Sequence, residues 1–297
     1  MWDALEQWLA QQQQRQLSEH TLLAYGRDVR EFLQFCEQRQ LLLRDVERGD
    51  IREYIRHKLQ QNYSATAMQR QLSSIRQFMA WLQQQNLLQH NPTQDIQIKR
   101  QNRKLPGLME SSLIAQLLDQ REPQQLPQQQ LWQRDKAMLE LLYSSGLRLS
   151  ELQGLSLQDL DFSRQLVRVI GKGNKMRIVP FGEKAKDSLL AWLKVYALWG
   201  YALQPNAALF ISQQGSALGQ RQIENRVKFQ AQRAGIQVDL HPHLLRHCFA
   251  SHLLSNSGDL RAVQEMLGHA NLTTTQIYTH VDFDALAAVY DRTHPRA

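Results

Sequence analysis

The segment 89–107 divides this chain of 297 residues into two parts. It contains Pro92 near its start and Pro106-Gly107 at its end, and both residue types interrupt helices and strands. Between them lie four basic residues within six positions, with no acidic residue among them: Lys99, Arg100, Arg103 and Lys104. Such a segment is either a solvated linker or a basic strap along a phosphate backbone. We therefore expect two domains, residues 1–88 and 108–297, and the length suffices for two separate cores.

Residues 1–88 show helical periodicity throughout. Apolar residues recur at three- and four-residue steps after Ser18, Asp50 and Ser64, which are residue types that favour helix N-termini. These apolar residues are expected to form a helical core: Leu22, Tyr25, Val29, Phe32, Leu33, Cys36, Ile51, Tyr54, Ile55, Met68, Leu72, Ile75, Met79 and Leu82. The basic residues of the outer faces are either solvated or contact phosphate groups: Arg27, Arg30, Arg52, Arg56, Lys58, Arg70 and Arg76.

Residues 108–297 combine helices with a few strands. A helix is expected over 131–145, ending at Gly146, with Ser150 as the cap of the next helix. The β-prone segments 166–170 and 176–179 flank Gly171-Lys172-Gly173-Asn174-Lys175, which favours a hairpin turn. A short strand is expected over 209–212. A helix over 220–234 would present a basic surface: Arg221, Arg226, Lys228 and Arg233.

Seven of the ten histidines lie after residue 240, and five of these seven lie in the stretch from His241 to Tyr278. Pro242 suits the first turn of a helix that would run to about Leu254. On this helix His243, Arg246 and His247 share one face, which would hold an anion while the opposite face packs.

A second helix is expected over 259–267, with Gly268 in the left-handed position after its end. His269 would then lie in a turn just past the helix. Each of the threonines 273–275 suits the start of a further helix, and Tyr278 would lie within its first turn or two.

Charge and cysteine usage bound the environment of the chain. The net charge of +7 favours a polyanionic partner, although charge alone does not identify one. The two cysteines, Cys36 and Cys248, lie within helix patterns without disulfide spacing, as in a reducing compartment. No segment resembles a signal peptide or a membrane span. We expect a soluble cytoplasmic protein that does not associate with membranes.

A metal site is one chemical interpretation of the histidines. His243 and His247 lie four residues apart on a helix, as zinc ligands can, and His241 would be a third ligand. The helix lacks the glutamate that zinc hydrolases place beside the first histidine. Arg246, between these histidines, would repel a cation. The sequence therefore favours a site without metal or other cofactor.

Phosphoryl transfer is the other interpretation. Two arginines, Arg148 and Arg246, would hold a phosphodiester and neutralise the added charge of a five-coordinate transition state. Tyr278 would be the nucleophile, because a phenol with a pKa near 10 ionises and departs more readily than an aliphatic alcohol. His243 and His269 would exchange protons with the phosphate oxygens and the attacking hydroxyl. Lys172 would protonate the departing 5′ oxygen. Such a transesterification needs no ATP.

These residues resemble those of the tyrosine recombinases, most closely the Xer group. The motifs that carry the resemblance extend over the second domain: Gly146-Leu-Arg-Leu-Ser-Glu-Leu, Gly171-Lys-Gly-Asn-Lys, His241-Pro-His-Leu-Leu-Arg-His, Leu267-Gly-His-Ala-Asn-Leu and Thr275-Gln-Ile-Tyr-Thr-His. The family's catalytic set maps without gaps onto this sequence: Arg148, Lys172, His243, Arg246, His269 and Tyr278. The ending from Val281 looks more like the XerC branch than the XerD branch. Cys248 stands where serine is common in relatives.

The resemblance implies a fold, a reaction and partners. It implies a mainly α protein with a small β component, in which a helical SAM-like core-binding domain (1–88) and an α+β catalytic domain (108–297) are joined by the basic linker 89–107. Tyr278 would form a 3′-phosphotyrosyl bond with double-stranded DNA at a dif-like site. Two copies would assemble with two of a XerD-like paralogue, under an FtsK-like septal DNA translocase, to resolve chromosome dimers at cell division.

Two features remain open from the sequence. The end of the chain carries apolar residues at helical spacing: Leu286, Ala287, Val289 and Tyr290. This segment looks like a tail that docks onto a neighbouring subunit, and packing within its own subunit is the alternative. A DNA-binding regulator or architectural protein without cleavage activity is the alternative function. A topoisomerase-like enzyme that relaxes DNA with the same residues is a third.

Overall fold

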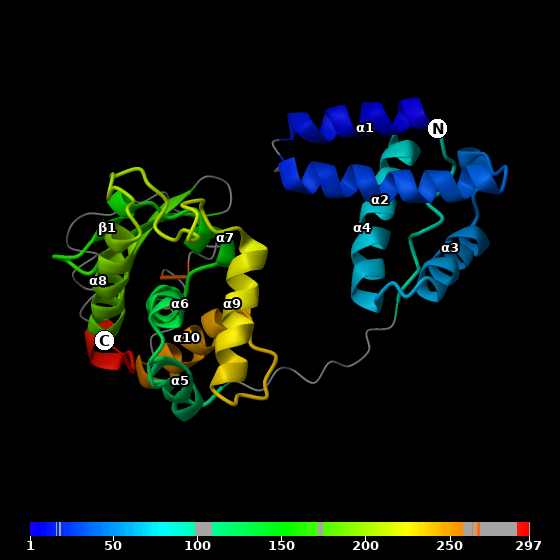
Figure 1. The fold of residues 1–297 in the computed structure, drawn as a ribbon. Coiled ribbons are helices and arrows are strands. Elements are labelled where there is room, and N and C mark those ends of the chain that lie inside the picture. Colours follow the sequence, from blue (N-terminus) through cyan, green and yellow to red (C-terminus); the bar gives the residue numbers. More distant parts are fainter. Residues whose placement is uncertain are drawn as a thin grey trace. The chain divides into compact units, whose positions relative to one another are not determined.

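The structure is a computed structural model. It describes residues 1–15, 17, 19–98, 109–171, 175–257, 263, 266–267 and 290–296. The chain forms two compact units, Met1–Lys104 and Leu105–Ala297 (Figure 1). Each has its own hydrophobic core. Among the described residues, no helix is both long enough and apolar enough to span a membrane.

The first unit is helical. Its elements are α1 (Trp2–Gln14), α2 (Glu19–Gln38), the short 3₁₀ helix η1 (Leu43–Asp45), α3 (Arg48–Gln60) and α4 (Ala65–Gln84). α1 lies alongside α2, and α4 packs against both (Figure 1). Trp8, Phe32 and Phe78 are fully buried between these helices. The periodicity of residues 1–88 therefore predicted a real helical core.

The helix starts of this unit test the predicted caps. The Ser64 Oγ accepts a hydrogen bond from the Ala67 N–H at 3.1 Å, so Ser64 caps α4 as predicted. Asp50 precedes the apolar run as predicted, but the helix itself begins at Arg48, so that Asp50 lies inside its first turn. There the Asp50 carboxylate accepts a hydrogen bond from the Glu47 N–H at 2.8 Å. Ser18 lies outside the described residues.

The second unit is built around one central helix. Its elements are α5 (Ser111–Leu118), α6 (Leu126–Ser145), α7 (Leu149–Gln153), η2 (Leu157–Asp159), β1 (Leu160–Asp161), β2 (Leu166–Ile170), β3 (Met176–Pro180), α8 (Glu183–Leu198), α9 (Gln220–Arg233) and α10 (Pro242–Ser257). α6 contacts α5, α7, α8, α9 and α10. Its residues 137–145 are all buried, as expected of a helix enclosed by others.

The three strands form one antiparallel sheet in the order β1-β2-β3. In its register Val167 is opposite Val179, and Val169 is opposite Arg177. The two strands of the predicted hairpin, 166–170 and 176–179, are confirmed as β2 and β3, which pair antiparallel. The segment 209–212 is not a strand, because it contributes only one isolated bridge, between Ile211 and Ala217. The predicted fold class, mainly α with a small sheet, is confirmed.

Two other boundaries differ from the prediction. α6 starts at Leu126, five residues before the expected 131, with a proline in its first turn. Arg148, and not Ser150, is the N-cap residue of α7. The predicted helices over 220–234 and from Pro242 are confirmed as α9 and α10.

The end of the chain packs within its own unit. Tyr290 is fully buried, and its ring stacks on His294 with centroids 4.6 Å apart. Arg296 donates two hydrogen bonds to Glu140 of α6. Tyr290 was expected to dock onto a neighbouring subunit, so the intramolecular alternative holds for this residue. Leu286, Ala287 and Val289 lie outside the described residues.

Candidate active site

The turn after α6 brings α6, α7 and α10 together. α6 ends at Gly146, whose φ of +57° is accessible to glycine with little strain. A side chain at this position would also meet the Phe249 ring of α10, since an added Cβ would lie 2.3 Å from its Cδ1. The Gly146 carbonyl accepts a hydrogen bond from Nη1 of Arg246. This close contact requires glycine and joins the end of α6 to α10.

Arg148 follows two residues later and is held by an acidic neighbour. Its backbone N–H donates to Glu151 Oε2 at 2.8 Å, and its Nη1 donates to Oε1 at 2.7 Å. The Glu151 side chain is 1% exposed, whereas that of Arg148 is 35% exposed. The guanidinium group is therefore fixed at one edge by a buried carboxylate and remains partly accessible to solvent.

Arg177 of β3 is a second partner of Glu151, and it was not among the residues predicted for the site. Its Nη1 and Nη2 donate to the two carboxylate oxygens at 2.5 and 2.9 Å. Burial alone would raise the pKa of Glu151, but the bonds and charges of Arg177, and then of Arg148, lower it to about 2. Glu151 is therefore an anion at neutral pH, shared by two arginines.

Arg246 of α10 is buried and bonded to backbone oxygens. It is 7% exposed and donates to the carbonyls of Gly146 and Leu267, the latter at 2.7 Å. Burial, and then the charges of Arg148 and Arg177, lower its pKa to about 10, so that it stays protonated at neutral pH. The sequence predicted an open anion-holding face here, but the Arg246 side chain is enclosed and only its neighbours on that face are exposed.

His243 lies on the exposed face of α10, near both predicted arginines. Partial burial lowers its pKa, and so do the nearby charges of His241, Arg246 and Arg148. The ring is therefore neutral at pH 7. His241 stacks on His243 with ring centroids 6.3 Å apart, and its Nδ1 accepts the Leu244 N–H at 3.1 Å.

The structure thus brings together three of the six predicted site residues: Arg148, His243 and Arg246. The other three, Lys172, His269 and Tyr278, lie outside the described residues. Within the segment 259–267, where a second helix was predicted, Val263, Met266 and Leu267 are buried.

The side chains of Arg148, Glu151, Arg177 and Arg246 form a corner of the second unit whose charge suits an anionic ligand. Arg148 and Arg177 are paired with the Glu151 carboxylate, and Arg246 lies near enough for its pKa to respond to the charges of all three. Three positive charges and one negative charge leave a net charge of +2. Among the described residues, no group of three or more histidine, cysteine, aspartate or glutamate side chains is arranged to hold a metal ion.

Comparison with known proteins identifies the family. A model of the phage integrase family matches residues 109–285, and a model of the phage integrase N-terminal SAM-like domain matches residues 5–86. The chain belongs to the phage integrase family. Tyrosine recombinase XerC of Stutzerimonas stutzeri (strain A1501) is 48% identical over 95% of this chain and 92% of its own length. Tyrosine recombinase XerC of Pseudomonas syringae pv. tomato (strain ATCC BAA-871 / DC3000) is 46% identical over 96% and 93%.

Solved structures of recombinases share the fold. The XerH site-specific recombinase bound to palindromic difH substrate, a post-cleavage complex, is 22% identical with a TM-score of 0.65, over 92% of this chain and 80% of that one. The Tn1549 transposon integrase in complex with transposon right end DNA is 22% identical with a TM-score of 0.67, over 97% and 98%. The resemblance to the Xer tyrosine recombinases, most like XerC, is confirmed by the relatives. The chain is a site-specific tyrosine recombinase.

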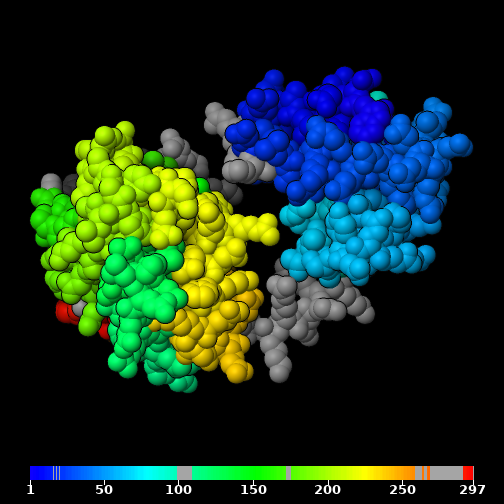
Figure 2. Space-filling view, viewed as in Figure 1, coloured from blue at the N-terminus to red at the C-terminus, as the bar shows by residue number. Residues whose placement is uncertain are grey.

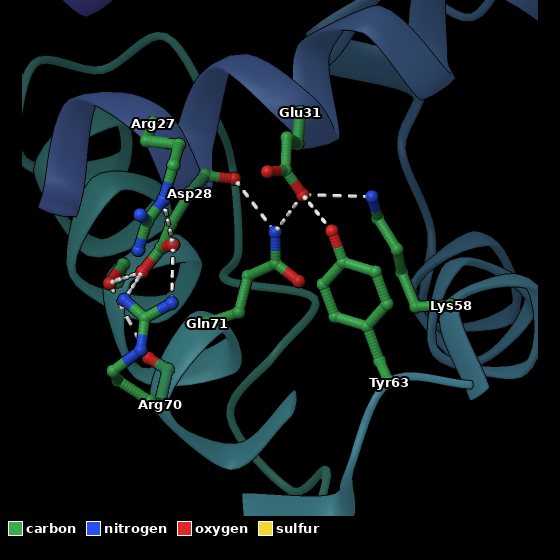
Figure 3. Close-up of polar contacts among 8 residues, drawn as sticks. Arg27, Asp28, Glu31, Lys58, Tyr63, Arg70 and Gln71 are labelled. Carbon is green, nitrogen blue, oxygen red and sulfur yellow. Dashed lines mark hydrogen bonds and ion pairs between the residues drawn. The ribbon is translucent and has the colours of Figure 1, made fainter. Parts of the chain in front are cut away.

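In the first unit of the recombinase, several basic side chains are held by two acidic side chains of α2, Asp28 and Glu31 (Figure 3). Arg70 of α4 donates through both terminal nitrogens to the carboxylate of Asp28 on α2, which is 1% exposed. Lys58 of α3 donates to Glu31 of α2 at 2.8 Å, and Gln71 donates to the same Glu31 oxygen at 2.9 Å. The Arg70 side chain remains 48% exposed, so its guanidinium group is oriented and still accessible.

Other predicted basic residues have structural partners. Arg76 donates to the carbonyls of Thr93 and Ile96, so it braces its own unit. On α9, which lies on the surface of the second unit (Figure 2), three of the four basic residues are engaged. Arg226 pairs with Asp135, Lys228 pairs with Asp239, and Arg233 donates to the Arg121 carbonyl and lies over the Trp132 ring. The expected basic surface of α9 is therefore weaker than its sequence indicated.

Proposed function

We propose that this recombinase cuts and rejoins DNA strands through a 3′-phosphotyrosyl bond to Tyr278, without a metal ion or ATP. The observation that supports it most is the corner where Arg148 and Arg246 lie close enough for each charge to lower the pKa of His243. Its net positive charge complements a phosphodiester, which carries one negative charge and gains another as the fifth oxygen adds. Each well-placed donor to that charge is worth about 100-fold in rate or more.

The bonds balance as a transesterification. The Tyr278 oxygen attacks the scissile phosphorus, and the bond from phosphorus to the 5′ oxygen breaks. Lys172 protonates the departing oxygen, and the imidazole rings of His243 and His269 exchange protons with the phosphate oxygens and the attacking hydroxyl. A 5′-hydroxyl of the partner duplex then attacks the phosphotyrosine in the reverse sense. One ester replaces another, so no external energy source is consumed.

The two units and the segment between them would clamp the DNA. The family models match 5–86 and 109–285, and the proposed domains are 1–88 and 108–297, joined by the basic linker 89–107. Arg70, oriented by Asp28, is a candidate phosphate contact of the first domain, because it combines a fixed guanidinium with exposure. The linker arginines and lysines would add contacts along the backbone.

The assembly would contain two copies of this chain and two of a XerD-like paralogue on a dif-like site. It would act in the cytoplasm on chromosome dimers at cell division, under an FtsK-like septal translocase. The XerC relatives, 44–48% identical, support this biological role. Residues 286–289 would dock onto a neighbouring subunit.

A nicked substrate tests the proposal, because loss of the short 5′ fragment traps the covalent adduct. The substrate carries the candidate recombination site of the protein's own genome and is incubated with and without the paralogue. Tyr278→Phe should abolish the adduct and leave DNA binding within a few-fold. An adduct that survives this change would mean another nucleophile. Binding without cleavage on any substrate would favour the regulator, and relaxation of plasmid lacking a site would favour the topoisomerase-like enzyme.

The acid role of Lys172 is tested separately. Lys172→Ala should slow cleavage of the normal phosphodiester. A substrate with sulfur at the 5′ bridging position has a leaving group that needs no proton, and it should restore cleavage by this variant. If the sulfur substrate gives no recovery, Lys172 is not the acid.

A further inference from the structure

We propose that Arg177 is a positioning residue of the active site. It acts as the counter-ion of Glu151, so that the Glu151 carboxylate does not offset the positive charge that Arg148 presents to the scissile phosphate. The inference rests on the proposed function and extends it to a residue outside the family's catalytic set. Arg177 lies on β3, far in sequence from both residues that it would position.

The hydrogen bonds divide Glu151 unequally between its two arginines. Arg177 contributes both terminal nitrogens, one to each carboxylate oxygen, at 2.5 and 2.9 Å. Arg148 contributes one side-chain nitrogen, Nη1 at 2.7 Å, and its backbone N–H at 2.8 Å. A bidentate pair is the stronger arrangement between a guanidinium and a carboxylate. Arg177 is therefore the principal partner of Glu151, which in turn orients Arg148.

Burial strengthens the electrostatic interaction between Arg177 and Glu151. The side chains of Arg177 and Glu151 are 9% and 1% exposed, so solvent screens their charges little. Without Arg177, Arg148 would be the remaining cation bonded to the Glu151 carboxylate. The negative charge of Glu151 would then offset the positive charge of Arg148. The corner would then carry a net charge of +1 in place of +2, which is too little for the doubly charged transition state.

A second contact extends the role of Arg177 toward another catalytic candidate. Its Nε donates to the Met266 carbonyl at 3.1 Å, and Arg246 donates to the next carbonyl, that of Leu267, at 2.7 Å. His269 follows Leu267 by two residues in the sequence. One arginine side chain thus ties the start of α7 to the segment that leads to His269.

The test varies the charge of the phosphate as well as that of the protein. Release of the 5′ fragment is measured on a nicked site with either a normal phosphodiester or a neutral methylphosphonate at the scissile position. Arg177→Met should slow release about 100-fold on the phosphodiester, comparable to removing one transition-state donor. On the methylphosphonate its defect relative to the parent should shrink to under about 10-fold, because less charge needs neutralising.

A charge-matched double variant and a buried control separate positioning from folding. Glu151→Gln removes the carboxylate, so Arg177→Met/Glu151→Gln should cleave at least about 10-fold faster than Arg177→Met alone. Arg177→Lys, which keeps the charge, should retain more activity than Arg177→Met. Arg134→Met is the control, since Arg134 is also a buried arginine paired with an acid, Asp135, and precedes Gly146 by 12 residues on α6. Its defect, if any, should be the same on both substrates.

Two outcomes overturn the proposal. An equal defect of Arg177→Met on both substrates, with no gain in the double variant, would assign this arginine to folding alone. Activity of Arg177→Met at the parental level would remove it from the site. If the parent protein forms no Tyr278 adduct on the phosphodiester, the proposed function fails first and this inference fails with it.

Discussion

Replacing Arg296 with methionine should destabilise the second unit by about 3 kcal/mol, because it leaves a buried carboxylate without its cation. Glu140 lies in the central helix α6 and is fully buried. Its two oxygens accept hydrogen bonds from Nη2 and Nε of Arg296 at 2.6 and 3.0 Å. Breaking a buried pair by removing one partner costs about 3–5 kcal/mol, and protonation of the carboxyl limits the loss.

The partner acids of Arg296 provide a matched control. Arg296 also pairs with Asp119 at 2.9 Å, but that carboxylate is 51% exposed, so the pair is worth roughly 0.2–1 kcal/mol. Asp119→Asn should therefore lower the melting temperature of the second unit by under about 4 °C, against roughly 6–12 °C for Arg296→Met. Glu140→Gln combined with Arg296→Met should recover a large part of that loss.

The effect should depend on pH in a defined direction. Burial raises the pKa of Glu140 above its usual 4.5, and Arg296 opposes this. Removing Arg296 raises the pKa further, so the folded variant takes up a proton that the unfolded chain does not hold at the same pH. The destabilisation should therefore be largest at pH 7–8 and shrink as the pH falls toward about 5. Calorimetry at several pH values measures this. A loss under about 1 kcal/mol, equal to that of Asp119→Asn and constant with pH, would refute the reasoning.

Three further predictions concern other parts of the molecule. Gly146→Ala should cost about 2 kcal/mol or more, from the left-handed backbone and the clash with Phe249, and a change under about 0.5 kcal/mol in a urea titration would contradict this. Glu151 has a pKa of about 2 in the folded protein, below its usual 4.5, so its stabilisation is present above pH 4.5 and lost as the pH falls toward 2. Glu151→Gln should accordingly flatten the acid limb of stability against pH, and an unchanged limb would exclude this group as its source. Asp28→Asn should lower the melting transition of the first unit by weakening its contact with Arg70, with a cost of about 1–3 kcal/mol, and a shift confined to the second unit would contradict that assignment.

Local patterns predicted the elements whose signals lie within a few residues of each other. The stripe after Ser64, the hairpin strands and the helix from Pro242 follow from periodicity and cap chemistry, and the structure contains all three. α6 was predicted to start late because Gln128–Gln130 carry no apolar stripe, although Pro127 suits a helix start. The cap of α7 was assigned to Ser150 because side-chain type was considered without the competing hydrogen bond that the Arg148 N–H donates to the Glu151 carboxylate.

The site was predictable where motifs specify it and not where distant residues meet. Arg177 pairs with Glu151 across 26 positions, a contact that no local pattern encodes. One signal was available, since Arg177 and Val179 share a face of β3, and a basic residue on a core-facing position needs a partner. Arg76 was taken for a surface cation because helical spacing does not reveal the Thr93 and Ile96 carbonyls that it reaches.

The most direct test of the account is to identify the bond formed with DNA. After incubation with the nicked site, the covalent adduct is digested with protease and nuclease and mapped by mass spectrometry. The account predicts a 3′-phosphate joined to Tyr278, formed in the presence of a chelator and without ATP. An adduct on any other residue, or a cut strand released with a free 3′ end and no protein attached, would contradict it.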